Sequence, residues 1–177
     1  MSDSTPVTRQ LDQLGIPYQT FRHPGPVHSL EQAAQERHQR PDQVIRSIVF
    51  RVGEGAFVMV LMAGATQVSW RGLRRFLGQS RLTIASEPEL IQYTGYVPGS
   101  VSPFGLPAPM RVLIDAPVLV NDVVSVGSGE RGLTVIMATA DLRRALPDAE
   151  VGQYGNNSST DPAPDVGGTR VTDESNG

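Results

Sequence analysis

The sequence predicts a mixed α+β fold in which a largely antiparallel sheet is flanked by helices. Two apolar runs, 45–52 and 56–62, are rich in β-branched and aromatic residues, and a short glycine-bearing segment joins them, which is typical of a β-hairpin. Helix-start patterns recur between strand-like runs, but the alternation is too irregular for a doubly wound sheet. A chain of 177 residues is expected to form one domain.

The chain is expected to begin with a helix. Thr5 followed by Pro6 is typical of a helix start, because proline is favoured in the first turn, and Gly15 fits the helix end. Ser29 opens a capping-box pattern that predicts a second helix to about Arg37. A short strand over 18–21 and a turn at 40–42 lie on either side of this helix.

The same signals mark the helices after the hairpin. Ser69 begins an amphipathic helix that Gly78 ends. Ser86 opens a capping box for the next helix, whose Leu90 and Ile91 are expected to point inward. The remaining expectations are strands over 82–85, 111–115, 118–120, 123–126 and 133–138, a tight turn at 127–132, and a last helix capped by Thr139 that runs to Leu146.

Composition excludes several chemistries. The chain has no cysteine, so it has no disulfide, thiolate metal ligand or cysteine nucleophile. All 15 basic residues are arginines, which excludes a lysine Schiff base. The three histidines lack metal-ligand spacing, so we expect no metal or other cofactor. No run resembles a signal peptide or a membrane span, so a cytoplasmic protein is expected.

The end of the chain differs from the rest. Residues 156–177 are mostly Asn, Ser, Thr, Asp, Pro and Gly, which predicts a disordered tail. The formal net charge of −3 falls on this segment, so the expected folded domain, 1–155, is close to neutral. A neutral domain can still carry a basic patch.

The most informative stretch is the Gly- and Pro-rich segment 94–107, which contains Gly95, Tyr96 and Gly99. Proline and glycine disfavour a helix or a central strand here, yet the segment is too apolar for a solvated linker. Long loops of this kind inside a compact domain usually form binding or active sites. A rigid crossover that only fills the core is the alternative.

Arg46 is the first candidate for chemistry. In a strand it shares a face with Ile48 and Phe50, because residues two apart point the same way. An arginine on an apolar face is paired, lies at the sheet margin, or awaits an anionic or polar ligand. Arg46 is near the strand's start, so its side chain could also simply extend to solvent.

Three further features are ambiguous. The letters Gly127-Ser128-Gly129-Glu-Arg-Gly match a dinucleotide fingerprint, but a strand-like run follows them, which favours a hairpin turn whose amides could meet a phosphate. Asp141 could belong to a site or only stabilise a helix start. Arg71, Arg74 and Arg75 have helical spacing and suit a phosphate backbone, although a solvated face is the alternative.

The segments 44–50, 94–105, 129–133 and 140–142 resemble the YbaK/prolyl-tRNA synthetase editing-domain family, in order and spacing, from about Thr8 to Leu146. The resemblance implies one domain with a mixed, strongly bent sheet. It implies a free-standing deacylase that acts on mischarged tRNA, mostly tRNA for proline carrying a small amino acid. The implied chemistry is metal-free and uses the terminal ribose hydroxyl of the tRNA. The implied partners are the charged acceptor end and an aminoacyl-tRNA synthetase.

The resemblance also implies site residues. The family motif has lysine where this chain has Arg46, which would be the catalytic cation. Gly95, Tyr96 and Gly99 would line the substrate pocket. The substrate-binding set is completed by His23, Gly127, Ser128, Gly129 and Asp141. Their helical spacing, and not the resemblance, is the reason to expect Arg71, Arg74 and Arg75 at the tRNA backbone.

Two alternatives stay open, the first of them because arginine bonds differently from an ammonium group. One is an inactive family member that binds tRNA ends or amino acids as a sensor. The other is a small-ligand binding protein without a tRNA role.

Overall fold

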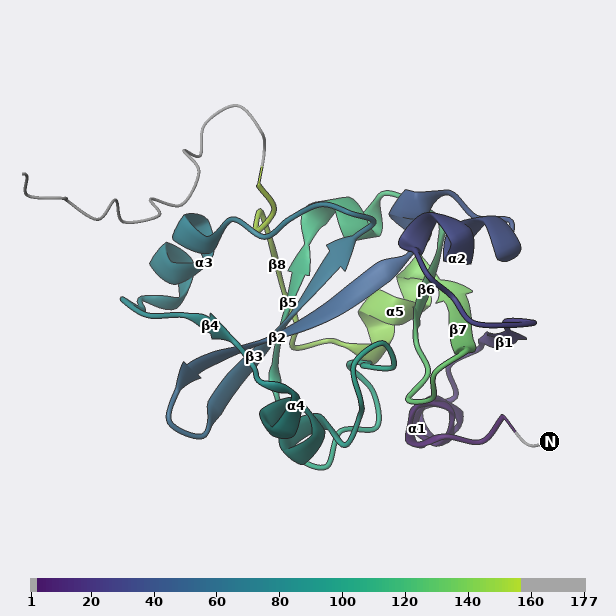
Figure 1. The fold of residues 1–177 in the computed structure, drawn as a ribbon, viewed down its shortest axis with the longest axis horizontal. Helices are drawn as coiled ribbons and strands as arrows, with labels where there is room; N and C mark the ends of the chain where they lie inside the picture. Colours follow the sequence, from purple (N-terminus) through teal and green to yellow (C-terminus); the bar gives the residue numbers. More distant parts are fainter. Residues whose placement is uncertain (1–2, 157–177) are drawn as a thin grey trace, which may run out of the picture.

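Two β-sheets organise residues 3–156, the part of the chain that the computed structural model describes (Figure 1). A three-stranded antiparallel sheet has the order β1-β7-β6, and a five-stranded mixed sheet has the order β4-β2-β3-β5-β8. An isolated bridge between Val44 and Ser125 joins the sheets where β2 begins. The strands are β1 (Gln19–Arg22), β2 (Ile45–Gly53), β3 (Ala56–Ala63), β4 (Thr83–Ile84), β5 (Arg111–Asp115), β6 (Val123–Gly127), β7 (Leu133–Ala138) and β8 (Glu150–Gly152).

The mixed α+β fold expected from the sequence is confirmed, including the β2–β3 hairpin. In the five-stranded sheet β2 is antiparallel to β3 and β4, whereas β5 is parallel to β3 and β8. The helices are α1 (Pro6–Gln13), α2 (Leu30–Glu36), α3 (Trp70–Leu77), α4 (Glu87–Thr94) and α5 (Thr139–Ala145), with short 3₁₀ turns η1 (Pro41–Gln43) and η2 (Ala116–Leu119).

The helix starts follow from their capping residues. The side chains of Thr5, Ser29, Ser69 and Ser86 each accept a hydrogen bond from a first-turn amide, which satisfies a donor that the helix leaves free. At the other end of α3, Gly78 has φ 65, a conformation that favours glycine. None of the helices in residues 3–156 has the length and apolar character needed to cross a membrane.

Hydrophobic residues cover both faces of the five-stranded sheet. Alternate residues of β3 point to opposite faces, as the strand period requires. Val58, Val60 and Met62 pack toward Leu73 of α3. Met59, Leu61 and Ala63 lie on the other face, in the core that the two sheets share.

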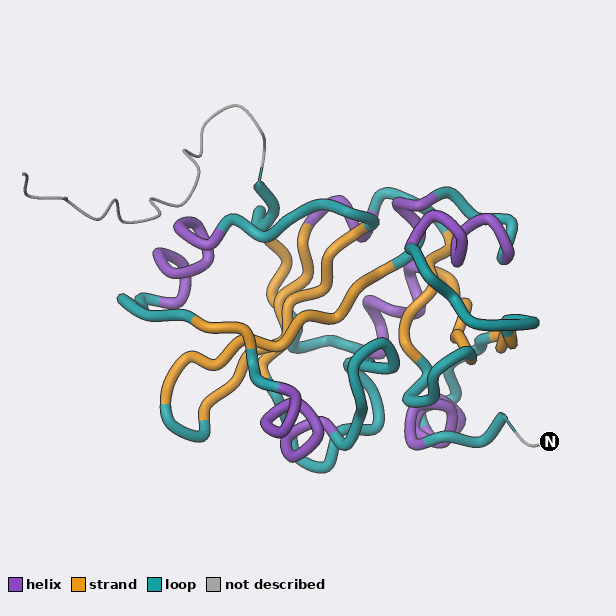
Figure 2. The backbone as a smooth tube through the Cα atoms, viewed as in Figure 1, coloured by secondary structure: helices purple, strands orange, loops and turns teal. Residues whose placement is uncertain are grey.

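The segment after α4 enters that shared core. Tyr96 and Phe104 are buried in it, and the Tyr96 hydroxyl donates to the Phe104 carbonyl at 2.6 Å. Figure 2 shows this long loop between the five-stranded sheet and the strands β6 and β7. The loop therefore fills part of the core and also approaches the three-stranded sheet.

The prediction of a strand over 118–120 is wrong. Pro117 fixes a 3₁₀ turn there, in which the Val120 amide donates to the Pro117 carbonyl. Val118 is buried but Val120 is 76% exposed, so the apolar run does not form one buried face.

Three smaller expectations also differ. Ile91 is exposed rather than inward. Thr139 is not a cap, because α5 begins after Ala138 and the Thr139 hydroxyl instead donates to the Asn121 carbonyl. Strand β8 was not expected, since its short sequence lacks an apolar run. The predicted tail lies, from residue 157 on, outside the described residues.

Candidate active site

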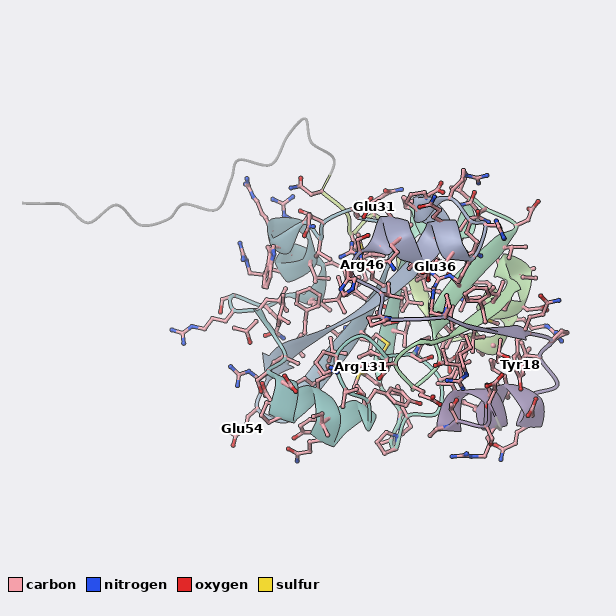
Figure 3. The ribbon with its side chains drawn as sticks, turned by 45° about the vertical axis from the view of Figure 1, so that its right-hand side comes forward. Tyr18, Glu31, Glu36, Arg46, Glu54 and Arg131 are labelled. Carbon is pink, nitrogen blue, oxygen red and sulfur yellow. The ribbon has the colours of Figure 1, made fainter. Side chains whose placement is uncertain are left out.

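A pocket of ≈ 490 Å³ opens where the start of β2 meets α2 and the three-stranded sheet. This volume lies within the range of about 300–1,000 Å³ that is usual for ligand sites. In Figure 3 Arg46 lies beside α2, the helix that carries Glu31 and Glu36, at the other end of β2 from Glu54. Polar or glycine positions that line the pocket include His23, Arg37, Arg46, Ser47, Gly99, Ser125, Gly127 and Thr134.

Backbone carbonyls occupy much of the Arg46 guanidinium. Its Nε donates to the Gly64 carbonyl at 2.5 Å, and its Nη2 donates to the Thr66 carbonyl. Both carbonyls belong to the segment that leaves β3 and leads to α3. Burial lowers the pKa of Arg46 from its ordinary value, although the guanidinium stays charged. Within residues 3–156 Nη1 has no hydrogen-bond partner, so one donor group remains for a ligand.

A second cation, Arg37, also lines the pocket. Arg37 is buried, and its Nη1 donates to His23 Nε2 at 3.0 Å and to Thr134 Oγ1 at 2.9 Å. Its Nε donates to Gln39 Oε1 at 3.3 Å. Burial lowers the pKa of Arg37, and it has no carboxylate in hydrogen-bond contact among residues 3–156.

These contacts fix how His23 holds its proton. A guanidinium donates only, so His23 Nε2 accepts and its Nδ1–H donates to the Glu36 carboxylate. The His23 hydrogen bond in turn holds the pKa of Glu36 below its usual value. Glu36, His23 and Arg37 therefore form a continuous polar chain, of which His23 and Arg37 line the pocket.

The sequence analysis did not identify Arg37 as a site residue. A signal was present, because Ala33 and Arg37 have the spacing of one helix face and Ala33 is buried. The partners of Arg37, however, lie on β7 and in the turn after β1, and nothing local in the sequence announces those contacts.

Ser47 supplies an unsatisfied hydroxyl to the same pocket. Its Oγ is buried and has no hydrogen-bond partner within the described residues. Buried polar atoms are nearly always hydrogen-bonded, so this atom is suited to meet a polar ligand. The neighbouring Ser125 is buried as well, and its hydroxyl lies 3.5 Å from the Gln43 carbonyl.

The Gly/Pro loop forms another wall and is fixed to the β6–β7 turn. The Gly129 amide donates to the Ser100 carbonyl at 2.9 Å, and Arg131 Nε donates to the Pro98 carbonyl at 2.9 Å. Gly99 and Val101 of the loop line the pocket next to Gly127, which lies against the Val101 carbonyl. That this loop forms part of a binding or active site stays a prediction.

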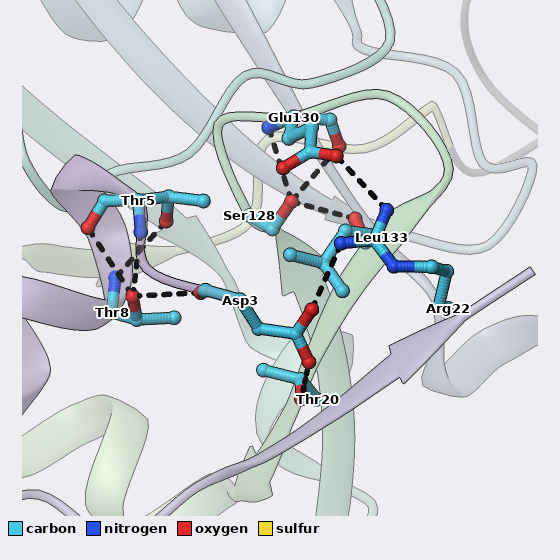
Figure 4. A network of polar contacts seen from close by, with 8 residues as sticks. All are labelled: Asp3, Thr5, Thr8, Thr20, Arg22, Ser128, Glu130 and Leu133. Carbon is cyan, nitrogen blue, oxygen red and sulfur yellow. Dashed lines mark hydrogen bonds and ion pairs between the residues drawn. The ribbon is translucent and has the colours of Figure 1, made fainter. Parts of the chain in front are cut away.

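Ser128 is occupied by its own turn. Its hydroxyl is fully buried, lies 2.7 Å from the Leu133 carbonyl and accepts from the Glu130 amide at 3.1 Å. Figure 4 shows how the Glu130 carboxylate continues the network to Arg22, which also pairs with Asp3. The hydrogen bond from Arg22 lowers the pKa of Asp3. This network ties the β6–β7 turn to β1 and to the start of α1.

The structure does not bring every candidate into the pocket. His23, Arg46, Gly99 and Gly127 line it, whereas Gly95, Tyr96, Ser128, Gly129 and Asp141 do not. Gly95 is the left-handed cap of α4, with φ 79. Asp141 pairs with Arg144 on α5 at 2.9 Å, as a residue at a helix start often does. Arg71 and Arg75 are exposed on α3, and Arg74 is half-buried there.

The family model of the aminoacyl-tRNA editing domain matches residues 24–145, which include most of this pocket. The chain belongs to the aminoacyl-tRNA editing domain family.

Relatives of this family include both free-standing and fused proteins. The chain is 26% identical to the prolyl-tRNA editing protein ProX of Acetoanaerobium sticklandii, over 79% of this chain and 88% of ProX. It is 31% identical to the proline–tRNA ligase of Stenotrophomonas maltophilia over 73% of this chain, but this match spans only 23% of the ligase. The chain thus corresponds to one part of that larger enzyme.

A solved structure has the same fold. The crystal structure of a proposed trans-editing enzyme for prolyl tRNA synthetase superposes with a TM-score of 0.79 at 24% identity, covering 88% of this chain and 98% of that one. At this identity the likeness establishes the editing-domain fold. Within residues 3–156 no group of three or more His, Asp or Glu side chains is placed to hold a metal ion.

Proposed function

We propose that the chain is a trans-acting aminoacyl-tRNA deacylase that removes a small non-cognate amino acid from tRNA for proline. The observation that supports this proposal is the pocket at the start of β2, which combines two arginines with an unsatisfied hydroxyl in a member of the editing-domain family. ProX, which is named as a prolyl-tRNA editing protein, matches the chain over most of its own length.

In the proposed reaction water attacks the ester carbonyl carbon, and the bond from that carbon to the ribose oxygen breaks. The ribose oxygen takes up a proton, so the products are a free amino acid and an uncharged tRNA. Nη1 of Arg46 stabilises the negative charge that develops on the carbonyl oxygen. The neighbouring ribose hydroxyl orients the water, and this scheme uses no metal ion.

Selectivity in this proposal comes from the size of the pocket. The wall formed by Gly99, Val101 and Gly127 limits the space beside the ester. A small amino acid fits there and proline is excluded. Such a division of labour is useful because a synthetase discriminates weakly between similar apolar side chains by binding alone, and editing compensates.

The tRNA would also contact the surface outside the pocket. Arg71, Arg74 and Arg75 lie on α3, and the segment that leads into α3 is the one held by Arg46. We place the phosphate backbone of the acceptor end on this helix. The proposal places the protein in the cytoplasm, where it acts on tRNA released by prolyl-tRNA synthetase or while docked on that enzyme.

The test is a deacylation assay with tRNA for proline charged separately with alanine, cysteine, serine and proline. We expect loss of at least one mischarged species while prolyl-tRNA is spared. Stability of all four charged species in the presence of the protein would contradict the proposal.

A specific observation favours a second candidate, a sensor that binds charged tRNA without hydrolysis. Two of the three guanidinium nitrogens of Arg46 donate to backbone carbonyls, so most of this side chain holds the segment after β3 and only one nitrogen is left for the ester. Retention of charged tRNA on the protein without hydrolysis would support the sensor. A protein of the editing fold without a tRNA role would instead show little salt-dependent affinity for tRNA.

A further inference from the structure

Two arginines line the pocket, and their surroundings differ. Arg46 is half-buried at the start of β2, with Nε and Nη2 directed at the Gly64 and Thr66 carbonyls. Arg37 is buried, and its Nη1 donates to two neutral acceptors. Within residues 3–156 its Nη2 has no hydrogen-bond partner. The direct hydrogen-bond acceptors of Arg37 are neutral, and the charge of Glu36 acts on the guanidinium from beyond His23. With no anion in direct contact, the buried cation favours one as its next partner.

The hydrogen-bonded chain of Glu36 and His23 orients the Arg37 guanidinium. Glu36 accepts from His23, and His23 accepts from Arg37, so the imidazole acts as a spacer between carboxylate and guanidinium. Glu36 itself is held by Gln32 Nε2 at 3.2 Å. The Thr134 hydroxyl of β7 accepts a second hydrogen bond from the same Arg37 nitrogen. This arrangement orders the guanidinium before any ligand arrives, which lowers the entropy cost of binding.

The chemistry of the ligand follows from its charges. The charged end of an aminoacyl-tRNA has no free carboxylate, because that group is esterified, and its amino group is positive. Its anionic groups are the phosphodiesters, of which the last joins the terminal nucleoside to the rest of the chain. A pocket of ≈ 490 Å³ has room for that nucleoside beside a small aminoacyl group.

We infer that Arg37, positioned by His23 and Glu36, binds the terminal phosphodiester of the charged tRNA. This inference rests on the proposed function and divides the work between the cations of the pocket. Arg37 holds the phosphate, and Arg46 is left to the ester. Arg37 is therefore a binding residue, and His23 and Glu36 are positioning residues.

The test separates the phosphate from the rest of the ligand. The probes are 3′-alanylamino-3′-deoxyadenosine, in which a stable amide replaces the ester, and the same compound with a 5′-phosphate. Calorimetry gives the dissociation constant of each probe, and their ratio is the contribution of the phosphate. We expect the phosphate to tighten binding to the native protein by roughly 10- to 100-fold, the strength of a charge-assisted hydrogen bond.

In Arg37→Gln this ratio is expected to fall close to one, while the probe without phosphate binds nearly as before. Arg46→Gln is expected to keep the ratio. Arg51→Gln, which removes an exposed arginine at the far end of β2, controls for general charge and should also keep it. Arg37→Lys retains the charge but not the paired donors, and should give an intermediate ratio. Circular dichroism verifies the fold of each variant.

The outcomes distinguish this inference from the proposed function. An affinity ratio of one between the two probes in the native protein overturns the assignment of Arg37, even if the protein hydrolyses mischarged tRNA. Loss of the ratio in Arg46→Gln also overturns it. The Arg46→Gln result can be read even if Arg37→Gln does not fold. A large ratio that Arg37→Gln removes supports the assignment even if no tRNA is hydrolysed. Binding of free alanine that depends on Arg37, without a phosphate effect, would overturn it and name a carboxylate as the anion.

Discussion

Gly127 lies directly against the carbonyl oxygen of Val101, so that a Cβ atom on Gly127 would be 2.0 Å from that oxygen. The contact joins the end of β6 to the Gly/Pro loop at the pocket wall. No side chain fits between them, and only glycine allows the two backbones to approach this closely. The geometry of the pocket therefore depends on the absence of a side chain at one position.

We expect Gly127→Ala to displace the loop and to impair both stability and activity. Overpacking at such a contact costs about 1–3 kcal/mol of unfolding free energy. Urea denaturation gives the stability, and the deacylation assay gives the activity. Gly25→Ala is the matched control, because a Cβ atom there meets nothing within 4 Å. Equal stability of the two variants would show that the loop can shift without cost.

Arg46 allows a prediction about both roles of one side chain. Arg46→Ala should lower the rate constant for deacylation by at least roughly 10²-fold, as loss of an oxyanion donor typically does. Arg46→Lys should keep or raise the rate, because an ammonium keeps the charge and can reach the ester as a point donor. Single-turnover assays with mischarged tRNA measure the rate constants.

The same variants test whether Arg46 also holds the segment after β3. Loss of donors to the Gly64 and Thr66 carbonyls should lower the thermal midpoint of Arg46→Ala more than that of Arg46→Lys. A fully active Arg46→Ala protein would remove Arg46 from the mechanism. An Arg46→Ala protein with normal stability but no activity would mean that Arg46 acts in catalysis and does not stabilise the segment after β3.

Much of the fold was predictable because its signals are local. The β2–β3 hairpin follows from two apolar runs and a glycine-bearing join, and the helix starts follow from serine or threonine caps. The failed strand at 118–120 shows the limit of such signals. Its apolar residues favour a strand, but Pro117 fixes the backbone of a 3₁₀ turn.

The candidate site was less predictable because its contacts are distant in sequence. Arg37 meets His23 and Thr134, and neither partner is implied by the helix that carries Arg37. Tyr96 illustrates the opposite case. Its place in the Gly/Pro loop suggested substrate contact, whereas its ring is buried and its hydroxyl bonds within the loop. Composition identifies such a loop but not the direction of each side chain.

Tyr96 also gives a prediction for alkaline pH. Burial raises its pKa from 10.0 to about 12, because the neutral phenol is favoured in the fold. The stability linked to this shift is fully present below pH 10 and is lost as the pH rises from 10 towards 12. Tyr96→Phe should be less stable than the native protein near neutral pH by roughly 0.5–1.5 kcal/mol, since the Phe104 carbonyl loses its donor.

Urea denaturation at a series of pH values measures this difference. The gap between the native protein and Tyr96→Phe should narrow above pH 10, because only the native protein has this phenol to ionise. Tyr18 and Tyr154 also have raised pKa values, but both proteins contain them, so their contributions cancel in the difference in unfolding free energy. A gap that stays constant with pH would mean that the pKa of Tyr96 is the same in the folded and unfolded protein, so that burial does not raise it.

The arginines of α3 give the last prediction, which concerns affinity for tRNA. Arg71 and Arg75 are exposed and lie on one face of the helix at i, i+4 spacing. If this face holds the acceptor end, the double variant Arg71→Gln/Arg75→Gln should bind tRNA more weakly. The slope of log affinity against log salt should become shallower by up to about 1 for each phosphate contact removed.

The matched control removes two exposed arginines elsewhere, in Arg9→Gln/Arg51→Gln. This variant has the same net charge as the α3 variant, so general attraction to tRNA falls equally in both. The adenosine probes should bind alike to both variants, because they reach the pocket but not α3. Equal salt slopes for the two variants would therefore place the tRNA backbone on another face, whereas a shallower slope for the α3 variant alone would place it on α3.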